Sequence, residues 1–345
     1  MENHTRILIL RASHANEFEL QNYTPLAKQM DIKVVTSHHP LTPITLPTIP
    51  LWSPTDLPPF PYRRQLLNRL ISGEKWLVGL EKIVQSQDIL HTAETYTPYT
   101  HQAVQLRRHG KVKRLICTCW ETIPHNNEKF AQLRQWKEES YQYVDIFHAP
   151  THRAKQALIK EGVDPKKVIV IPYGIDLSRF KPAKHKKVKK KPPIVLTVAR
   201  PVAEKGYKLW QQISHDLSDM AEFRWVSNVP YTDMPNIYQQ ADIFFLPSLT
   251  TPTWEEQYGM VLIEAMAVGL PIVATNTGAI AEVVDKAGIL VNQNIQSLSS
   301  ALARLILDTK VRTLLANISL TRTKANYSHL NCVKKLSNLY KMLSI

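Results

Sequence analysis

Residues 258–275 constrain the fold of this chain most strongly. Apolar side chains recur there at the i, i+3, i+4, i+7 and i+8 spacing of one buried helix face: Tyr258, Val261, Leu262, Ala265 and Met266. Gly269 and Pro271 predict the end of this helix, and the run Pro271–Thr275 predicts the next strand. The sequence therefore predicts a helix that begins near Gly259 and leads directly into a strand.

Two glutamates flank the predicted helix start. Glu256 precedes it in a loop, and Glu264 lies about one and a half turns inside it. A helix N-terminus favours an anion, and Gly259 lets the backbone amides of Gly259, Met260 and Val261 approach it closely. This arrangement suits a sugar nucleotide, with amides facing the diphosphate and carboxylates accepting hydroxyl hydrogen bonds. The alternative is an amphipathic core helix with solvated glutamates.

Short apolar runs alternate with helical periodicity along most of the chain. This β-α-β order predicts parallel sheets and right-handed crossovers. The predicted strands are 6–10, 32–36, 88–91, 113–120, 144–150, 167–171, 194–199, 223–227, 242–248, 271–275 and 288–291. Helices are expected at 19–30, 63–87, 100–108, 233–240, 280–284, 297–307, 310–325 and 329–343. Eight prolines between residues 39 and 62 predict an extended, loop-like segment.

The length of 345 residues is sufficient for two domains with separate cores. The chain lacks a run of about eighteen apolar residues and a signal-peptide pattern, so we expect a cytoplasmic protein without a transmembrane helix. Its three cysteines cannot form a disulfide framework or a zinc site. Cys117 and Cys119 alternate in a predicted strand, which favours packing in the core.

The net charge of +14 includes seven lysines between residues 181 and 191. A lysine block bounded by prolines is most simply a solvated linker. It could also contact anionic lipid head groups at the inner membrane face. Nucleic-acid binding is not expected, because no basic platform interleaved with aromatic residues accompanies the block.

The segment from Glu256 to Pro271 resembles a family signature. Glu256 and Glu264 are separated by seven residues and followed by Ala-Met-Ala and Gly-Leu-Pro, as in the EX7E motif of the retaining family 4 glycosyltransferases. The resemblance implies a GT-B fold, with two Rossmann-like parallel-sheet domains that face a cleft. The implied divisions are an acceptor-side domain (1–180), a Lys/Pro-rich linker (181–193) and a donor-binding domain (194–345), with helix 329–343 packing back on the first domain.

A second segment, Arg200–Gly206, resembles the R-L-x-x-E-K-G loop of the same family. Its residues alone suggest a phosphate clamp, because Arg200 and Lys205 follow a strand and precede a helix. The alternative is two solvated cations. The resemblance assigns Arg200 and Lys205 to the donor diphosphate, Glu264 to the ribose hydroxyls and Glu256 to the hydroxyls of the donor sugar.

The first domain departs from the family pattern. No glycine occurs before Gly73, so the family's glycine-rich loop is replaced by the segment Arg11–Asn16. Trp120 and Glu121 stand where the family often has a histidine, and Trp120 could either stack on a sugar face or fill the core. The candidate acceptor or sugar contacts are therefore Trp120, Glu121 and Asn16.

These features together predict a retaining, hexosyltransferase-type glycosyltransferase that uses a nucleotide diphosphate sugar. The acceptor would be a glycan, a lipid-linked molecule or a small molecule. No D-x-D pair accompanied by further carboxylates appears, so neither a metal nor another cofactor is expected. Two alternatives remain open, namely a GT-B sugar-nucleotide epimerase and a non-catalytic sugar-nucleotide-binding partner.

Overall fold

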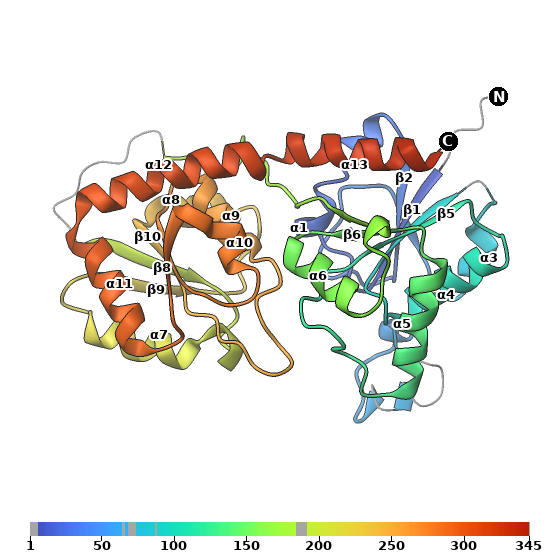
Figure 1. The fold of residues 1–345 in the computed structure, drawn as a ribbon, viewed down its shortest axis with the longest axis horizontal. Coiled ribbons are helices and arrows are strands. Elements are labelled where there is room, and N and C mark those ends of the chain that lie inside the picture. Colours follow the sequence, from blue (N-terminus) through green and yellow to red (C-terminus); the bar gives the residue numbers. More distant parts are fainter. Residues whose placement is uncertain (1–5, 64–65, 68–73, 87, 184–191, 345) are drawn as a thin grey trace. The chain divides into compact units, whose positions relative to one another are not determined.

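The computed structural model describes residues 6–63, 66–67, 74–86, 88–183 and 192–344. It divides the chain into two compact units (Figure 1). The first unit extends to Tyr173 and also includes the C-terminal segment from Val333, and the second unit comprises Gly174–Cys332. Each unit contains one parallel sheet, so the prediction of two parallel-sheet α/β domains is confirmed. The predicted linker lies largely outside the described residues, because residues 184–191 are not among them.

The sheet of the first unit has seven parallel strands in the order β3-β2-β1-β4-β5-β6-β7. The strands are β1 (Arg6–Ala12), β2 (Asp31–Thr36), β3 (Thr48–Pro50), β4 (Ile89–Ala93), β5 (Arg114–Thr118), β6 (Ile146–Ala149) and β7 (Val168–Val170). The helices are α1 (Glu17–Leu20), α3 (Leu80–Ile83), α4 (Pro98–Arg108), α5 (Ala131–Tyr143) and α6 (His152–Lys160), with 3-10 turns η1 (Leu26–Lys28), η2 (Pro54–Asp56) and η3 (Pro165–Lys167). Strand β1 has β2 on one side and β4 on the other, so the strand order reverses beside it.

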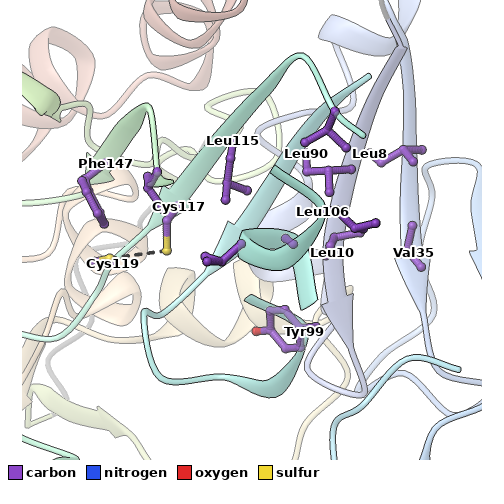
Figure 2. Packing of buried hydrophobic residues seen from close by; sticks show 14 of the residues in the cluster. Leu8, Leu10, Val35, Leu90, Tyr99, Leu106, Leu115, Cys117, Cys119 and Phe147 are labelled. Atoms are coloured by element: carbon purple, nitrogen blue, oxygen red, sulfur yellow. Dashed lines mark hydrogen bonds between the residues drawn. The ribbon is translucent and has the colours of Figure 1, made fainter. Parts of the chain in front are cut away.

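One face of this sheet packs against helix α4. Leu8, Leu90 and Leu115 come from three strands and share a buried cluster with Leu106 of α4 (Figure 2). Cys117 and Cys119 are buried in the same cluster as free thiols, with 3.7 Å between their sulfur atoms. The alternating pair is thus part of the core, as the strand pattern predicts.

Two predicted helices in the first unit are wrong in part. The helix expected over 19–30 is broken into α1 and η1, because Pro25 lacks the N–H that a helix interior requires. The helix expected over 63–87 falls partly outside the described residues. Within the described part, residues 74–79 are not helical, and α3 begins only after Gly79, which has a φ of +82°.

The proline-rich segment contains an edge strand that its composition did not predict. Residues Thr48–Pro50 pair in parallel with β2, with Thr36 opposite Pro50. Proline can occupy this position because an edge strand need not donate every backbone N–H to a neighbour. The segment is therefore less irregular than expected.

The sheet of the second unit has five parallel strands in the order β12-β11-β10-β8-β9. The strands are β8 (Ile194–Val198), β9 (Glu222–Val226), β10 (Ile243–Leu246), β11 (Ile272–Thr275) and β12 (Gly288–Val291). The helices are α7 (Tyr207–Asp216), α8 (Met234–Gln240), α9 (Met260–Ala267), α10 (Ile280–Val284), α11 (Ile295–Leu307) and α12 (Thr309–Asn326), with turns η4 (Ala203–Lys205) and η5 (Asp285–Ala287). These bounds agree closely with the predicted elements of this half.

The core of the second unit follows from side-chain alternation along its strands. Val195, Phe245 and Val273 point to the face covered by α7 and α11, where Ile213 and Leu302 meet them. The order of the strands reverses between β8 and β10, which are neighbours. In parallel α/β sheets, ligands bind at the carboxyl ends of the strands beside such a reversal.

The last helix, α13 (His329–Ser344), begins in the second unit and ends in the first. The chain also passes from the first unit to the second at Tyr173 and Gly174. Just before α13 begins, Ser328 forms a parallel bridge with Ile175 of this other connection. A Cβ on Gly174 would lie 2.6 Å from the Cα of His329, so only glycine allows this close approach. The two segments that connect the units therefore lie side by side.

Candidate functional site

The predicted donor-site residues follow β8 and β10, at the reversal of the strand order in the second sheet. Strand β8 is followed by Arg200 and by turn η4, which ends at Lys205. Strand β10 is followed by residues 247–259, which contain Glu256 and lead to α9. Two separate predicted segments therefore reach the edge of the sheet where ligand sites form.

Lys205 and Glu256 form a close ion pair in this position. Lys205 Nζ lies 2.6 Å from Glu256 Oε2, and Ser248 Oγ donates to the same oxygen over 3.2 Å. The Lys205 ammonium also lies 4.8 Å from the centre of the Trp254 ring, within cation–π range. Glu256 is buried and Lys205 is largely shielded. The ion pair, the Ser248 hydrogen bond and the Trp254 ring together fix the orientation of the Lys205 and Glu256 side chains.

Two glycines fix the loops that carry this pair. A Cβ on Gly206 would lie 1.9 Å from the carbonyl oxygen of Pro247, which keeps the turn after β8 against the loop after β10. A Cβ on Gly278 would lie 2.1 Å from the carbonyl oxygen of Glu256. That same oxygen accepts a hydrogen bond from the amide of Ala279 over 2.7 Å. The backbone of Glu256 is thus set by packing rather than by its own side chain.

Helix α9 begins beside Glu256, as predicted. Gly259 is in the left-handed region with a φ of +78°, and a Cβ there would meet Leu262 at 2.8 Å and Glu256 at 3.6 Å. Met260 and Val261 form the first turn and are half-buried. Because the first amides of a helix have no acceptor within it, they are available to an anion. Arg200, which follows β8, is exposed.

Glu264 lies on the buried side of α9 and has a different set of partners. Its Oε2 accepts a hydrogen bond from the Tyr238 hydroxyl over 2.6 Å. Burial raises the pKa of Glu264 to about 7, whereas hydrogen bonds from Tyr238 and Tyr231 and the charge of Arg179 oppose that rise. The EX7E pair therefore combines one carboxylate that is paired with a cation and one that is held by phenols.

The candidate residues of the first unit have mainly local partners. Trp120 stacks on Tyr173, with ring centres 4.7 Å apart and planes 13° from parallel. The Glu121 carboxylate accepts from the amides of Thr122 and Ile123 and from two asparagine side chains. Asn16 caps α1 by accepting from the Glu19 amide over 3.0 Å. Glu121 and Asn16 thus stabilise loops at the carboxyl edge of the first sheet.

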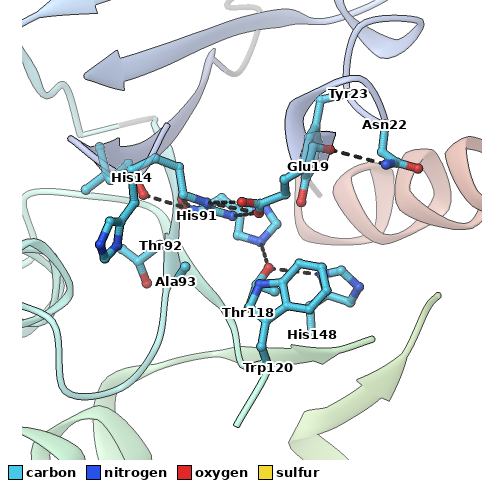
Figure 3. A network of polar contacts seen from close by, with 12 residues as sticks. His14, Glu19, Asn22, Tyr23, His91, Thr92, Ala93, Thr118, Trp120 and His148 are labelled. Carbon is cyan, nitrogen blue, oxygen red and sulfur yellow. Dashed lines mark hydrogen bonds and ion pairs between the residues drawn. The ribbon is translucent and has the colours of Figure 1, made fainter. Parts of the chain in front are cut away.

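The sequence patterns did not predict a buried polar network at this edge, part of which joins His91, Thr118 and His148 (Figure 3). Arg11 Nη2 lies 2.6 Å from Glu19 Oε1, and Tyr173 donates to that oxygen over 3.0 Å. Tyr23 and Tyr173 are joined by a hydroxyl–hydroxyl hydrogen bond of 2.7 Å. The segment that replaces the family's glycine-rich loop therefore contributes a buried cation with a buried counter-charge.

A chain of hydrogen bonds continues through two buried histidines. His148 Nε2 lies 2.7 Å from the carbonyl oxygen of Ile171 and must donate to it. Its Nδ1 then accepts from Thr118, whose oxygen accepts in turn from His91 Nε2 over 2.7 Å. His91 Nδ1 finally accepts from the Tyr340 hydroxyl of α13 over 2.6 Å. Burial and nearby Arg11 hold the pKa values of both histidines low, with that of His148 at about 4, so both rings are neutral at pH 7 and each has one donor and one acceptor nitrogen.

Other contributors were not predicted because their patterns look ordinary. Tyr238 lies in a short helix where it reads as a core residue, and Ser248 follows a strand as loop serines often do. Trp254 directly precedes Glu255 and Glu256, and this position is the one local signal that could have identified Trp254 as part of the site. In the described part of the chain, no group of three or more His, Cys, Asp or Glu side chains is arranged to hold a metal ion.

Comparison with known proteins gives consistent matches over both units. The family model "Glycosyltransferase Family 4" matches residues 26–179, and "Glycosyl transferases group 1" matches residues 211–319. Anabaena HepE in complex with UDP has a similar structure, with a TM-score of 0.75 and 16% identity over 98% of this chain and 100% of HepE. At this identity the structural match shows the GT-B fold alone.

Two curated relatives from Escherichia coli are also similar. O-antigen chain mannosyltransferase B is 28% identical over 44% of this chain and 40% of its own length. The UDP-Gal:alpha-D-GlcNAc-diphosphoundecaprenol alpha-1,3-galactosyltransferase is 26% identical over 79% of this chain and 80% of its own. The first match thus covers less than half of that relative. Among the described residues, none of the helices has the length and apolar character needed to cross a membrane.

Proposed function

Because the chain belongs to the group 1, family 4 glycosyltransferases, we propose that it transfers a sugar from a nucleotide diphosphate sugar to an acceptor. The second unit would bind the donor. The observation that carries this proposal is the pairing of Lys205 with Glu256, 2.6 Å apart, beside the first turn of α9. A cation, a carboxylate and helix amides at one sheet edge match the phosphate and hydroxyl groups of such a donor.

Lys205 and Arg200 would stabilise the charge that develops on the departing diphosphate. Transfer of a glycosyl group leaves a negative charge on the β-phosphate, and preorganised cations are most effective where that charge develops. The amides of Met260 and Val261 would add hydrogen bonds. Glu256 would accept from hydroxyls of the donor sugar, and Glu264 from the ribose.

The same residues support a retaining reaction that needs no metal. Glu256 is committed to Lys205 and Ser248, so it is suited to orient a sugar rather than to activate an incoming hydroxyl as a strong base. The cationic side chains would supply the charge that a metal supplies in other transferases. Product analysis by NMR should show the anomeric configuration of the donor, and turnover should persist in EDTA. An inverted product or loss of turnover in EDTA would contradict this part.

A glycan or lipid-linked glycan is the acceptor class that the relatives favour. One curated relative acts in O-antigen chains, and the other transfers galactose to a diphosphoundecaprenol-linked sugar. We propose a similar envelope-polysaccharide acceptor for this chain, presented at the inner membrane face. A small-molecule acceptor is the alternative.

The proposal is tested by incubating the protein with UDP-, GDP- and ADP-sugars and following hydrolysis and transfer to a lipid-linked acceptor pool. Turnover of one donor, lost in Lys205→Ala, is the expected result. Tight nucleotide binding without hydrolysis or transfer would instead favour a non-catalytic binding partner. Epimerisation of the free donor without an acceptor would favour an epimerase.

A further inference from the structure

Tyr238 and Glu264 form a hydrogen bond that is shielded from water. Tyr238 lies on α8 and Glu264 on α9, and the phenolic oxygen is 2.6 Å from Oε2. Tyr238 is 0% exposed and Glu264 is 4% exposed. A hydrogen bond from a neutral donor to a carboxylate in such a place is strong and directional, because neither partner can exchange it for water.

The bond leaves the carboxylate with acceptor capacity for other partners. An ionised carboxylate has two oxygens with about four acceptor sites in all, and Tyr238 takes one site on Oε2. The other groups that act on this carboxyl are Tyr231, which precedes α8, and Arg179, which lies in the segment before the second sheet. The Arg179 guanidinium lies 4.8 Å from the centre of the Tyr231 ring and donates to the Tyr231 backbone carbonyl, so these two residues contact each other at two points.

We propose that Tyr238 is a positioning residue for Glu264: it holds Oε2 so that the ionised carboxylate presents its remaining acceptor sites to the ribose hydroxyls of the donor nucleotide. This inference rests on the proposed donor binding in the second unit. Tyr238 would not touch the donor itself. Its effect would pass entirely through the orientation and the charge state of Glu264.

The charge state gives the inference a signature that core packing would not have. Burial raises the pKa of Glu264 to about 7, and the Tyr238 hydroxyl counteracts this rise because it stabilises the carboxylate. Removing the hydroxyl should raise the pKa of Glu264 further. The ionised carboxylate, which is the stronger acceptor, would then be scarce at pH 7 and recover at higher pH, whereas the effect of a packing defect would be independent of pH.

The test measures binding of UDP, GDP and ADP, each with its 2′-deoxyribose counterpart, by calorimetry at pH 7 and pH 9. The variants are Tyr238→Phe and, as a matched control, Tyr327→Phe. Tyr327 is also a buried tyrosine of the second unit, and its hydroxyl donates to the Val283 carbonyl over 3.2 Å, away from Glu264. The control loses a buried hydrogen bond without changing the proposed site.

We expect the wild-type protein to bind one ribonucleotide about 10-fold more tightly than its deoxy form. In Tyr238→Phe this ratio should fall to about 2-fold at pH 7 and rise again at pH 9, while Tyr327→Phe keeps the wild-type ratio. An unchanged ratio in Tyr238→Phe at both pH values would overturn the inference and leave donor binding intact. Wild-type binding without ribose discrimination would overturn it as well. Failure of the wild-type protein to bind any of the nucleotides would instead overturn the proposed function.

Discussion

Lys205 Nζ and Glu256 Oε2 are 2.6 Å apart, although the two residues are 51 positions apart in the chain. The ion pair brings the end of turn η4 against the loop before α9. The Lys205 ammonium also lies over the Trp254 ring, and Ser248 Oγ donates to the same Glu256 oxygen. In the free protein the charge of Lys205 is thus balanced by Glu256. A donor diphosphate would meet a lysine that is already oriented, which lowers the entropy cost of forming the complex.

Removing the ammonium should therefore abolish most turnover. Lys205→Ala is expected to lower kcat/KM by about 10²–10³-fold, the usual cost of losing one preorganised donor at a developing charge. The matched control is Lys208→Ala, which removes an exposed lysine of α7 nearby. Steady-state kinetics with the identified donor checks this prediction. Equal effects of the two substitutions would contradict the role of Lys205.

The backbone of Glu256 gives a prediction that does not touch its side chain. Gly278→Ala should place a Cβ 2.1 Å from the Glu256 carbonyl oxygen, displace the carboxylate and remove activity. Gly110→Ala is the control, because Gly110 has a similar positive φ of +67° but no atom within 4 Å of the added Cβ. Both variants carry about 1 kcal/mol of backbone strain. Turnover and melting temperature should fall well below those of the control only in Gly278→Ala.

The buried carboxyl of Glu94 should make the stability of the protein depend on pH. Burial raises its pKa to about 8, while the Trp120 amide donates to it over 2.8 Å. A carboxyl whose folded pKa is raised stabilises the fold fully below its unfolded pKa and loses that contribution as pH rises toward 8. Glu94→Gln keeps the acceptor and removes the titration. Urea unfolding of the variant and the wild type should agree near pH 4 and favour the variant by about 4–5 kcal/mol at pH 9. If the free energies of unfolding of the wild type and Glu94→Gln differed by the same amount at every pH, the raised pKa of Glu94 would be contradicted.

The hydrogen bond between Tyr340 and His91 should help to hold α13 on the first unit. Tyr340→Phe leaves His91 Nδ1 without its only donor in the described hydrogen-bond chain, at a cost of about 1–3 kcal/mol for a buried acceptor. Hydrogen exchange of the α13 amides should accelerate accordingly. Tyr62→Phe, at a tyrosine that is 78% exposed, serves as the control and should change nothing. Unchanged exchange in Tyr340→Phe would show that the helix is held by apolar contacts alone.

The sequence predicted the two parallel sheets better than the rest, and the structure brings two of its candidate donor-site residues, Lys205 and Glu256, together. Strands and helices that are marked by apolar runs, or by periodicity such as that around Leu262, are determined by residues close in the sequence. They can therefore be predicted without a structure. The break before Pro25 follows from a proline inside the predicted helix, a local signal that the apolar periodicity outweighed in the prediction. The edge strand at Thr48–Pro50 depends on which strand lies alongside it, which local patterns do not encode. The partners of a buried polar group are harder still. Tyr238 and Glu264 meet only after α8 and α9 pack, and His91 reads in the sequence as a polar residue at the end of a strand.

The most direct test of the account is a thermal-shift screen over UDP-, GDP- and ADP-sugars with the wild-type protein, Lys205→Ala and Glu264→Gln. The account predicts that one nucleotide sugar stabilises the wild-type protein and that both variants lose most of this stabilisation, because they lack the diphosphate contact and the ribose contact. A shift that persists unchanged in both variants would contradict the proposed site. The absence of any shift in the wild-type protein would contradict donor binding itself.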